Sequence, residues 1–452
     1  MNLPNYFLAD LPPEATLSPD MLAEACRALK RNREQYLATR STDQLVRLLA
    51  QVAEGWLAPD SAFRRCALEK GPAQTGFGPA TLAHGLDGFF KQLTRENLRE
   101  LLVQDLGGAR RLDEPCATIH GARSRFAMAV GPEFLVHVTA GNVPNPALMS
   151  MVLGVLTRAA QFVKCASGAA FLPRLFAHSI YEADHKLGAC LEIAEWRGGN
   201  APLEQVLFEE ADCVTATGSD QTLAAIRARL PMRTRFLGYG HRVSFGYVAG
   251  EMLTGSGAKH LAAAAADDVV AWNQLGCLSP HVIYAQTGGE VTPARFAELL
   301  ADELERREAV EPRGAVPVAI AATIASRREI YAVRAAHSAD TQMWRSADST
   351  AWTVVYEEDP RFQISCLHRF VYVKPARDLA EALQSAESVR GAVSTVGLAA
   401  AADASAKLAA QLARWGATRI CPLGQMQNPA LVWRHDGRPS LGDLVTWTDW
   451  EK

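Results

Sequence analysis

The stretch "FLVHVTAGNVPNPALM", residues 134–149, joins a short apolar run to a turn and then to a helix. The run from Phe134 to Ala140 has the length of a strand that is buried on both faces. Glycine, asparagine and proline follow; these are common turn formers, and proline suits the first turn of a helix. The stretch therefore predicts a strand followed directly by a helix, the unit from which parallel sheets are built.

The same alternation continues along the chain. Further strands are expected at 161–165, 190–196 and 212–217, and helices at 146–160, 171–189, 202–210 and 220–229. Short apolar runs that alternate with helices are typical of a parallel sheet with helices on both faces. A second α/β region is expected from about residue 251 to 420, with strands at 281–285, 352–357 and 369–375 and helices at 258–272, 293–307, 315–336, 378–388 and 401–415. Two α/β lobes imply a cleft between them.

The flanking segments differ from this pattern. Residues 20–110 predict helices, and Ser41 with Gln44 three positions later forms a candidate capping box. Residues 117–132 alternate around a glycine, which indicates a β-hairpin or an extended arm. The C-terminal stretch carries tryptophans around the turn-forming "HDGRP", between two strand-like pieces. We expect it to pair with the arm or with a partner subunit.

Composition excludes several classes of protein. The chain has 452 residues, 48% of them hydrophobic, which is enough for two or three domains with a substantial core. Its net charge of −3 and the absence of a basic tract argue against nucleic-acid binding. No run of about 18 apolar residues and no signal-peptide pattern occur, so we expect a cytoplasmic protein without a membrane span.

The cysteines and histidines do not predict a metal site. Nine cysteines form an odd and scattered set, which favours reduced thiols over a disulfide framework. No C-x-x-C, H-x-x-x-H or H-E-x-x-H pattern is present.

Three candidate binding residues or turns follow predicted strands of the first lobe. A G-x-G-x-x-G fingerprint is absent, so any dinucleotide must bind in another way. Asn142 lies where a strand ends, and its amide could stabilise an oxyanion or simply form a turn. Lys164 ends the next strand and could bind a ribose hydroxyl or a phosphate, or remain solvated. Gly218 and Ser219 open a helix, which suits a phosphate or ordinary N-capping.

Cys277 is the candidate nucleophile. A free cysteine is usually a small buried hydrophobe, but Gly276 allows close approach of a substrate and Pro280 stiffens the loop. A thiolate at this position needs a lowered pKa, from backbone donors or a nearby positive charge. His241 and His281 are candidate partners, although a lone histidine more often has a structural role.

In this order, the motifs resemble the aldehyde dehydrogenase superfamily. The resemblance rests on "GNVPNP" with Asn142, "FVKCAS" with Lys164, "TGS" at 217–219, and Cys277 lying 135 residues after Asn142. Within the superfamily the chain resembles the LuxC-type fatty acyl reductases, through "NQLGCLSPHVIYA", "GHRVSFG" and the closing "GATRICPLGQMQNPALVWRHDGRPSLGDLVTWTDWE". The similarity extends over roughly residues 110–452.

The resemblance implies an α/β fold like that of aldehyde dehydrogenases, with a Rossmann-type cofactor-binding domain, an α/β catalytic domain, a β oligomerisation arm and a helical N-terminal segment. The implied segments are a helical lead-in that packs on the cofactor domain (1–110), the arm (111–132), the cofactor-binding domain (133–250), the catalytic domain (251–425) and a C-terminal β tail (426–452). Because the arm and tail correspond to dimer-building segments of the superfamily, a homo-oligomer, either a dimer or a tetramer, is expected.

The resemblance also implies catalytic roles. Cys277 would accept the acyl group as a thioester, and Asn142 with the Cys277 backbone N–H would form the oxyanion hole. The family's hydrolytic members have a glutamate base in a stretch that matches residues 236–246, where this chain has no carboxylate. Without that base a thioester resists water and can wait for reduction. His241, in the same segment, is a candidate proton donor or cofactor contact.

The cofactor residues are assigned in the same way. Lys164 would hold the adenosine ribose and the 2′-phosphate of NADPH, while Thr217, Gly218 and Ser219 would lie beside the cofactor. Either acid of "VVYEEDP", Glu357 or Glu358, would bond the nicotinamide ribose.

The resulting prediction is NADPH-dependent reduction of a fatty acyl thioester to the aldehyde through an acyl-cysteine. The acyl donor would be acyl-CoA, an acyl-carrier protein or an acyl-transferase protein. The alternatives are an aldehyde dehydrogenase that oxidises an aldehyde to the acid with NAD or NADP, and a catalytically silent acyl-binding subunit.

Overall fold

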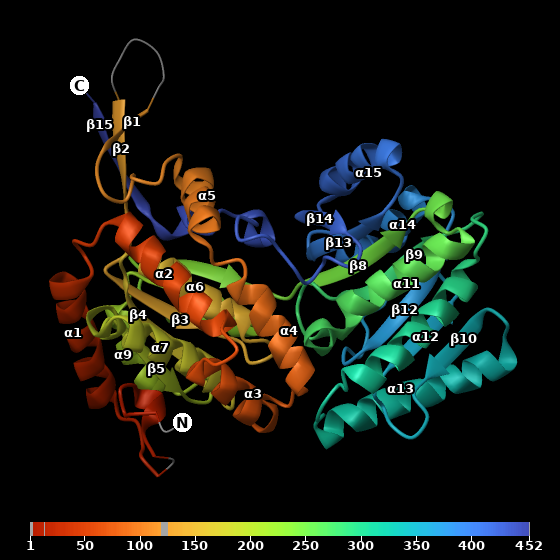
Figure 1. Cartoon of the computed structure of the whole chain (residues 1–452), viewed down its shortest axis with the longest axis horizontal. Coiled ribbons are helices and arrows are strands. Elements are labelled where there is room, and N and C mark those ends of the chain that lie inside the picture. Colours follow the sequence, from red (N-terminus) through yellow and green to blue (C-terminus); the bar gives the residue numbers. More distant parts are fainter. Residues whose placement is uncertain (1–2, 13, 119–124, 452) are drawn as a thin grey trace.

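Five parallel strands form the sheet of the first lobe, in the order β5-β4-β3-β6-β7. The computed structural model describes residues 3–12, 14–118 and 125–451 and places two α/β lobes side by side (Figure 1). The strands of the first sheet are β3 (Phe134–Val138), β4 (Ala160–Cys165), β5 (Leu191–Glu195), β6 (Cys213–Thr217) and β7 (Arg235–Tyr239). The predicted parallel sheet is thus confirmed, and the strand that opens it, β3, lies at its centre. The connections after β3 and β6 leave the sheet at the point where the strand order reverses, which is the usual ligand site of such sheets.

The crossover helices follow the predicted positions with one difference. They are α6 (Asn145–Leu156), α7 (Phe171–Ala183), α8 (His185–Gly188), α9 (Ala201–Glu210) and α10 (Asp220–Arg227). The single helix expected at 171–189 is two helices, because Asp184 is extended between them and its carboxylate caps α8 at the backbone N–H of Leu187.

The N-terminal helices cover both faces of this sheet. They are α1 (Pro19–Tyr36), α2 (Thr42–Leu57), α3 (Ala62–Thr75), α4 (Pro79–Phe90) and α5 (Arg95–Leu106). Helix α1 packs beside α9 on one face, while α2 packs against α6 and α7 on the other. The capping box expected at Ser41 and Gln44 is present at the start of α2. The helical segment is therefore part of the first lobe's core.

The second lobe contains a seven-stranded sheet in the order β10-β11-β12-β9-β8-β13-β14. Its strands are β8 (Val243–Val248), β9 (Pro280–Gln286), β10 (Thr341–Arg345), β11 (Thr353–Glu357), β12 (Phe370–Ala376), β13 (Val393–Ala399) and β14 (Arg419–Pro422), and its helices are α11 (Gly255–Val270), α12 (Pro293–Val310), α13 (Val318–His337), α14 (Leu379–Ser385) and α15 (Ala402–Trp415). Only β10, at one edge, runs antiparallel to its neighbour.

Strand β8 shows that the expected boundary at residue 250 lies too late. This strand pairs with β9 and β13, so the chain leaves the first sheet at Tyr239 and enters the second at Val243. The structure also contains strands that sequence reasoning did not predict: β7, β8, β10, β13 and β14. Three of these, β7, β10 and β14, are edge strands, whose mostly half-exposed residues do not show the apolar runs of central strands.

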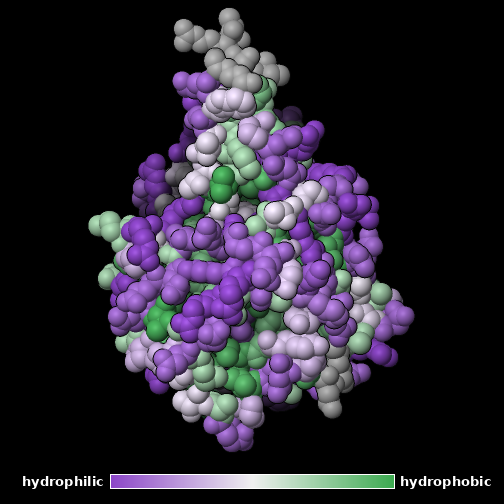
Figure 2. Space-filling view, turned by 90° about the vertical axis from the view of Figure 1, so that its left-hand side faces the viewer, coloured by the Kyte–Doolittle hydropathy of each residue, from purple (hydrophilic) through white to green (hydrophobic). Residues whose placement is uncertain are grey.

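A small antiparallel sheet projects from the first lobe. Its strands are β1 (Cys116–Thr118), β2 (Arg125–Val130) and β15 (Thr446–Glu451), in the order β1-β2-β15. The tail thus pairs with the arm of its own chain, which was one of the two expected alternatives, and it contributes one strand. The arm's residues 119–124 lie outside the described residues. Figure 2 shows the sheet standing above a face of the first lobe that is largely hydrophilic.

All nine cysteines are free thiols. In the described part of the chain, no group of three or more metal-ligating side chains comes together. Within the same residues, none of the helices combines the length and the apolar character that crossing a bilayer requires.

Candidate active site

A cavity of about 730 Å³ lies between the lobes and reaches Cys277. Helices α4 and α6 of the first lobe, α11 of the second lobe and the tail between Gly424 and Leu444 form its walls. Its apolar lining includes Phe89, Val143, Met149, Leu153, Leu278 and Trp433. Cavities of this size and character commonly bind small molecules with an apolar part.

The loop that carries Cys277 precedes β9 and faces the carboxyl edge of the first sheet. The Ser244 hydroxyl donates to the Cys277 carbonyl oxygen at 2.7 Å. The Gln427 amide, from the tail, donates to the Ser279 hydroxyl at 2.7 Å. The loop is therefore bonded to β8 on one side and to the tail on the other.

The environment of Cys277 favours the protonated thiol. Burial, together with the negative charge of Asp436, raises its pKa to about 12. Its own backbone N–H, the Arg242 guanidinium and the Ser394 hydroxyl act in the opposite direction and lower the pKa. The lowered pKa that a thiolate requires is thus not found, so attack by this cysteine needs a proton to leave the thiol.

Replacing Asp436 by asparagine is expected to lower the pKa of Cys277. Asp436 is bonded to Arg242 at 3.1 Å, and its charge disfavours the thiolate. Removing that charge should move the midpoint of the pH profile for alkylation by iodoacetamide downward by roughly one pH unit. Asp443→Asn is the control, since Asp443 is another tail carboxylate and its charge is not among the causes of the Cys277 shift. An unchanged or raised midpoint for Asp436→Asn would contradict this account.

Asn142 contacts the nucleophile loop directly. Its side-chain amide donates to the carbonyl oxygen of Leu275 at 2.7 Å, which joins the turn after β3 to the loop two residues before Cys277. Asn142 is exposed, and its side chain does not line the large cavity, whereas Thr217 at the end of β6 does. The structure thus brings Asn142, Thr217 and the Cys277 loop together across the lobes.

Lys164 is buried at the carboxyl end of β4, with 5% of its surface exposed. Its ammonium lies 5.6 Å from the centre of the Trp196 ring. Burial lowers its pKa, while the charges of Glu204 and Glu195 act against that shift. None of the described carboxylates lies within salt-bridge distance of this ammonium. The ammonium can therefore bind an anionic or hydroxyl-bearing ligand.

The turn after β6 caps helix α10, which is one of the two roles that the sequence left open. The Ser219 hydroxyl accepts a hydrogen bond from the backbone N–H of Thr222 at 3.2 Å, at the start of α10. The backbone N–H of Gly218 donates to the carbonyl oxygen of Tyr239 at 3.2 Å.

The structure does not bring Glu357 and Glu358 to Cys277. Strands β11 and β9 are both parallel to β12, which lies between them. Glu357 is at the carboxyl end of β11, whereas Cys277 precedes the amino end of β9, so the two positions lie at opposite ends of the strands. Glu357 is buried and paired with Lys374 at 3.0 Å and with Arg334. Glu358 accepts a hydrogen bond from the Tyr356 hydroxyl. The two acids were assigned through the family resemblance, and the sequence could not show at which end of the sheet's strands they lie.

His241 lies in the short connection between β7 and β8. Its backbone N–H donates to the Asp220 carboxylate at 3.1 Å. Its side chain is exposed and is not part of the cavity wall. The structure thus places His241 at the junction of the lobes, but not against the thiol. His281 instead bonds the Ser365 hydroxyl at 3.0 Å inside the second lobe.

Helix α4 reaches the nucleophile loop, which sequence reasoning did not show. The Trp272 ring packs directly on Gly85, where a methyl group would overlap it, and also makes an edge contact with Phe77. Thr81 of the same helix donates to the Glu311 carboxylate at 3.0 Å, and so ties the helix to the second lobe. A glycine inside a helix can indicate that a bulky ring packs on it, and Gly85 was the available signal of this kind. Its partner, Trp272, is distant in sequence, so the contact could not be predicted.

Replacing Gly85 by alanine is expected to displace Trp272. Because ring and backbone both resist movement, the change should cost about 1–3 kcal/mol and lower the melting temperature. Gly88→Ala is the matched control on the same helix: its methyl group would meet Asn428 Oδ1 at 3.5 Å, an ordinary contact, so stability should be unchanged or rise. Thermal unfolding of both variants tests the contact, and equal melting temperatures would contradict it.

Comparisons with known proteins point to one family. A family model described as "Acyl-CoA reductase (LuxC)" matches residues 37–447. A long-chain acyl-protein thioester reductase from Aliivibrio fischeri is 24% identical over 420 residues, which cover 91% of this chain and 82% of that protein.

Solved structures show the same fold. A putative aldehyde dehydrogenase, PutA, from Anabaena variabilis superposes with a TM-score of 0.71 at 17% identity, covering 97% of this chain and 94% of that one. An NAD-dependent benzaldehyde dehydrogenase from Corynebacterium glutamicum gives a TM-score of 0.72 at 13% identity, covering 99% and 94%. The predicted aldehyde-dehydrogenase-like fold is confirmed, and the family match over most of the length shows that this chain belongs to the LuxC family of acyl-CoA reductases.

Proposed function

We propose that this protein reduces a long-chain acyl thioester to the aldehyde with NADPH, through a thioester on Cys277. The observation that carries the proposal is that Cys277 lies at a largely apolar cavity between two lobes, in a loop bonded to Asn142. The name of the Aliivibrio fischeri relative, a long-chain acyl-protein thioester reductase, supports the same substrate class. Acyl-CoA and an acyl-carrier or acyl-transferase protein are the candidate donors.

The shape of the cavity supports an acyl substrate. Pro146, Met149, Ser150 and Leu153 lie at helical spacing on α6 and present one face to the cavity. Phe89 of α4 and Leu431 of the tail line it from other elements. An acyl chain that replaced water along these surfaces would gain about 0.8 kcal/mol for each buried methylene group.

In the first step Cys277 gives up its proton and its Sγ bonds to the acyl carbonyl carbon. The bond between that carbon and the donor's sulfur then breaks, and the donor leaves as a thiol with the proton. Sulfur replaces sulfur, so the exchange is close to balanced in free energy. Asn142 and the backbone N–H of Cys277 are proposed to stabilise the intermediate oxyanion; for this the Asn142 amide must turn from the Leu275 carbonyl.

The residues present fit a nicotinamide cofactor at the carboxyl edge of the first sheet. Lys164 offers a buried ammonium without a carboxylate partner in the described part of the chain, which suits ribose hydroxyls or the 2′-phosphate of NADPH. Thr217 lies between this edge and the cavity. When bound, reduced nicotinamide supplies hydride, which with one proton converts the thioester into free aldehyde and the Cys277 thiol.

A single-turnover experiment tests the proposed reaction. Acyl-CoA thioesters of increasing chain length are mixed with enzyme and either NADPH or NADH, and aldehyde is measured. The proposal expects aldehyde from long chains and faster turnover with NADPH. Faster formation of acid from aldehyde and NADP, in the absence of CoA, would favour the oxidative alternative. A complete lack of turnover with CoA-bound and protein-bound donors would favour a silent acyl-binding subunit.

A further inference from the structure

Two short segments beside the nucleophile loop have left-handed backbones. Trp272, Asn273 and Gln274 have φ angles of 50°, 51° and 64°, and residues 367–369 have φ angles of 60°, 55° and 66°. None of the six is glycine. L-residues rarely adopt this conformation, and runs of three persist only where the surroundings hold them. The two turns also face one another across the amino ends of β9 and β12.

Gln274 closes the loop that carries Cys277. Its amide nitrogen donates to the Pro280 carbonyl oxygen at 2.7 Å, which joins the residues on either side of 275–279. The same side chain pairs with the backbone of Phe370: it donates to the carbonyl oxygen at 2.9 Å and accepts from the N–H at 2.8 Å. Gln274 is fully buried. The ends of the nucleophile loop are thus fixed to the end of the second left-handed turn.

Arg369 locks the first turn to the second. Its guanidinium, with none of its surface exposed, donates from Nε to Asn273 Oδ1 at 3.1 Å. Its Nη1 donates to the Glu308 carboxylate at 2.9 Å and to the Glu311 carbonyl oxygen at 2.8 Å. Burial lowers the pKa of Arg369 to about 10, so it remains charged at neutral pH.

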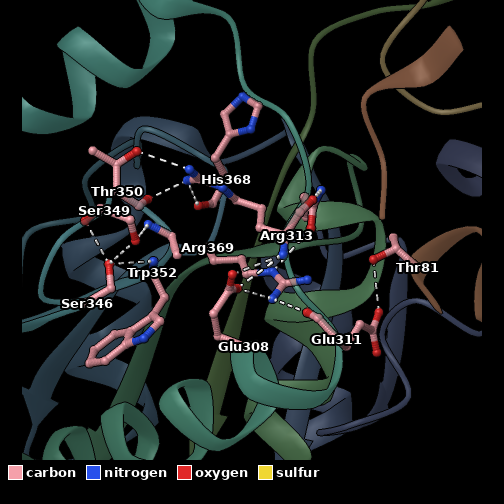
Figure 3. A network of polar contacts seen from close by, with 12 residues as sticks. Thr81, Glu308, Glu311, Arg313, Ser346, Ser349, Thr350, Trp352, His368 and Arg369 are labelled. Atoms are coloured by element: carbon pink, nitrogen blue, oxygen red, sulfur yellow. Dashed lines mark hydrogen bonds and ion pairs between the residues drawn. The ribbon is translucent and has the colours of Figure 1, made fainter. Parts of the chain in front are cut away.

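Arg313 connects the two turns a second time. Its carbonyl oxygen accepts from the Asn273 amide at 2.7 Å, and its guanidinium donates to the His368 carbonyl oxygen at 3.2 Å. The same guanidinium bonds the Thr350 hydroxyl at 3.0 Å. Figure 3 shows Arg313 and Arg369 side by side between Glu308 and Thr350, with Thr81 of α4 bonded to Glu311 at the edge of the network.

We propose that Asn273 and Arg369 are positioning residues for Cys277: they hold two left-handed turns together so that the loop between Gln274 and Pro280 presents the thiol to the acyl carbonyl. This role rests on the proposed function of Cys277. Neither side chain touches the reacting atoms. Their contribution is to keep the loop in one conformation that an isolated chain would seldom adopt.

The physical reason is the sensitivity of nucleophilic attack to small displacements. Reacting atoms must approach within about 3–3.5 Å, and a displacement of about 1 Å can cost 100-fold in rate. Cutting the bond between Arg369 and Asn273 would let the first turn relax toward ordinary backbone angles. The loop would then carry Cys277 away from the acyl carbonyl, and Trp272 and Leu278 of the cavity wall would move with it, whereas the walls from α4, α6 and the tail would stay in place. Because the proposal places the acyl chain along those remaining walls, kcat should fall while KM for the acyl donor stays nearly constant.

The test compares two buried arginines of the second lobe. Arg369→Gln removes the lock, and Arg328→Gln is the matched control, because Arg328 bonds Thr353, Ser346 and Trp352 but neither turn. Both should lower the melting temperature. Only Arg369→Gln should lower kcat, by about 10- to 100-fold, with KM for the donor within about twofold.

A second pair of variants keeps the test valid if Arg369→Gln folds poorly. Asn273→Asp keeps the oxygen that Arg369 bonds and loses the donor to Arg313, whereas Asn273→Ala loses both. Asn273→Asp should therefore retain more kcat than Asn273→Ala. Wild-type kcat in Asn273→Ala and Arg369→Gln would overturn the proposal, as would an equal kcat loss in Arg328→Gln.

Alkylation of Cys277 by iodoacetamide separates this inference from the proposed function. The expected result is a changed alkylation rate in Arg369→Gln and Asn273→Ala, and a wild-type rate in Arg328→Gln. If the wild type forms no acyl-Cys277, the proposed function fails, and the alkylation rates alone decide the inference. Unchanged rates in all variants would overturn it.

Discussion

Cys277→Ser is expected to reduce aldehyde formation from acyl thioesters by at least about 10³-fold, the range found when a covalent nucleophile is removed. A serine hydroxyl is a weaker nucleophile that would need a strong base, and the stretch 236–246 supplies no carboxylate. Since thiol and hydroxyl are similar in size, the cavity and the bond from Ser244 to the backbone of residue 277 should persist. Steady-state aldehyde production measures the effect.

Cys421→Ser is the control for this prediction. Cys421 is also a partly exposed free thiol, at the end of the second sheet, and burial raises its pKa to about 11. It does not line the cavity, so its replacement should leave turnover unchanged. A Cys277→Ser enzyme with more than a tenth of wild-type turnover would remove this cysteine from the mechanism.

Ser150→Trp is expected to reduce kcat/KM for long-chain acyl donors by about 100-fold, while short-chain donors keep most of theirs. Ser150 lines the cavity from α6, and an indole at this position would occupy space that the proposal gives to the acyl chain. Each methylene lost from an apolar pocket is worth about 10-fold or more in selectivity, so excluding a few is sufficient.

Ser150→Ala is the matched variant, because it removes the hydroxyl and leaves the cavity open. It should resemble the wild type at every chain length. The measurement is kcat/KM across a series of acyl-CoA thioesters. A uniform loss for short and long donors in Ser150→Trp would show that the cavity does not hold the chain.

The fold could be largely predicted from local patterns, because central parallel strands are apolar runs between helices. The apolar run at 134–140 and the runs after it predicted the first sheet, and the apolar runs that follow Cys277 predicted the second. The edge strands β10 and β14 lack that signal. The boundary between the lobes was placed one strand too late because β8 follows β7 after a short connection, and only its pairing shows which sheet it joins.

The site could be predicted only in part. Asn142 and Cys277 were candidates because each stands in a turn at the end of a predicted element, and the family resemblance selected them; the structure joins their loops. Glu357 or Glu358 was assigned through the family resemblance, but the strand directions put the end of β11 on the side of the sheet opposite to Cys277. The left-handed turn at 272–274 leaves no trace in composition, since none of its residues is glycine. Its cause is tertiary: Gly85, Arg369 and Phe370 come from distant segments.

The most direct test of the central claim is mass spectrometry of the intact protein after mixing with a long-chain acyl-CoA in the absence of nicotinamide. The account predicts the addition of one acyl group, located on the peptide that contains Cys277, and its release as aldehyde when NADPH is added. Aldehyde production without an acyl group on Cys277, or with the acyl group on another residue, would contradict it.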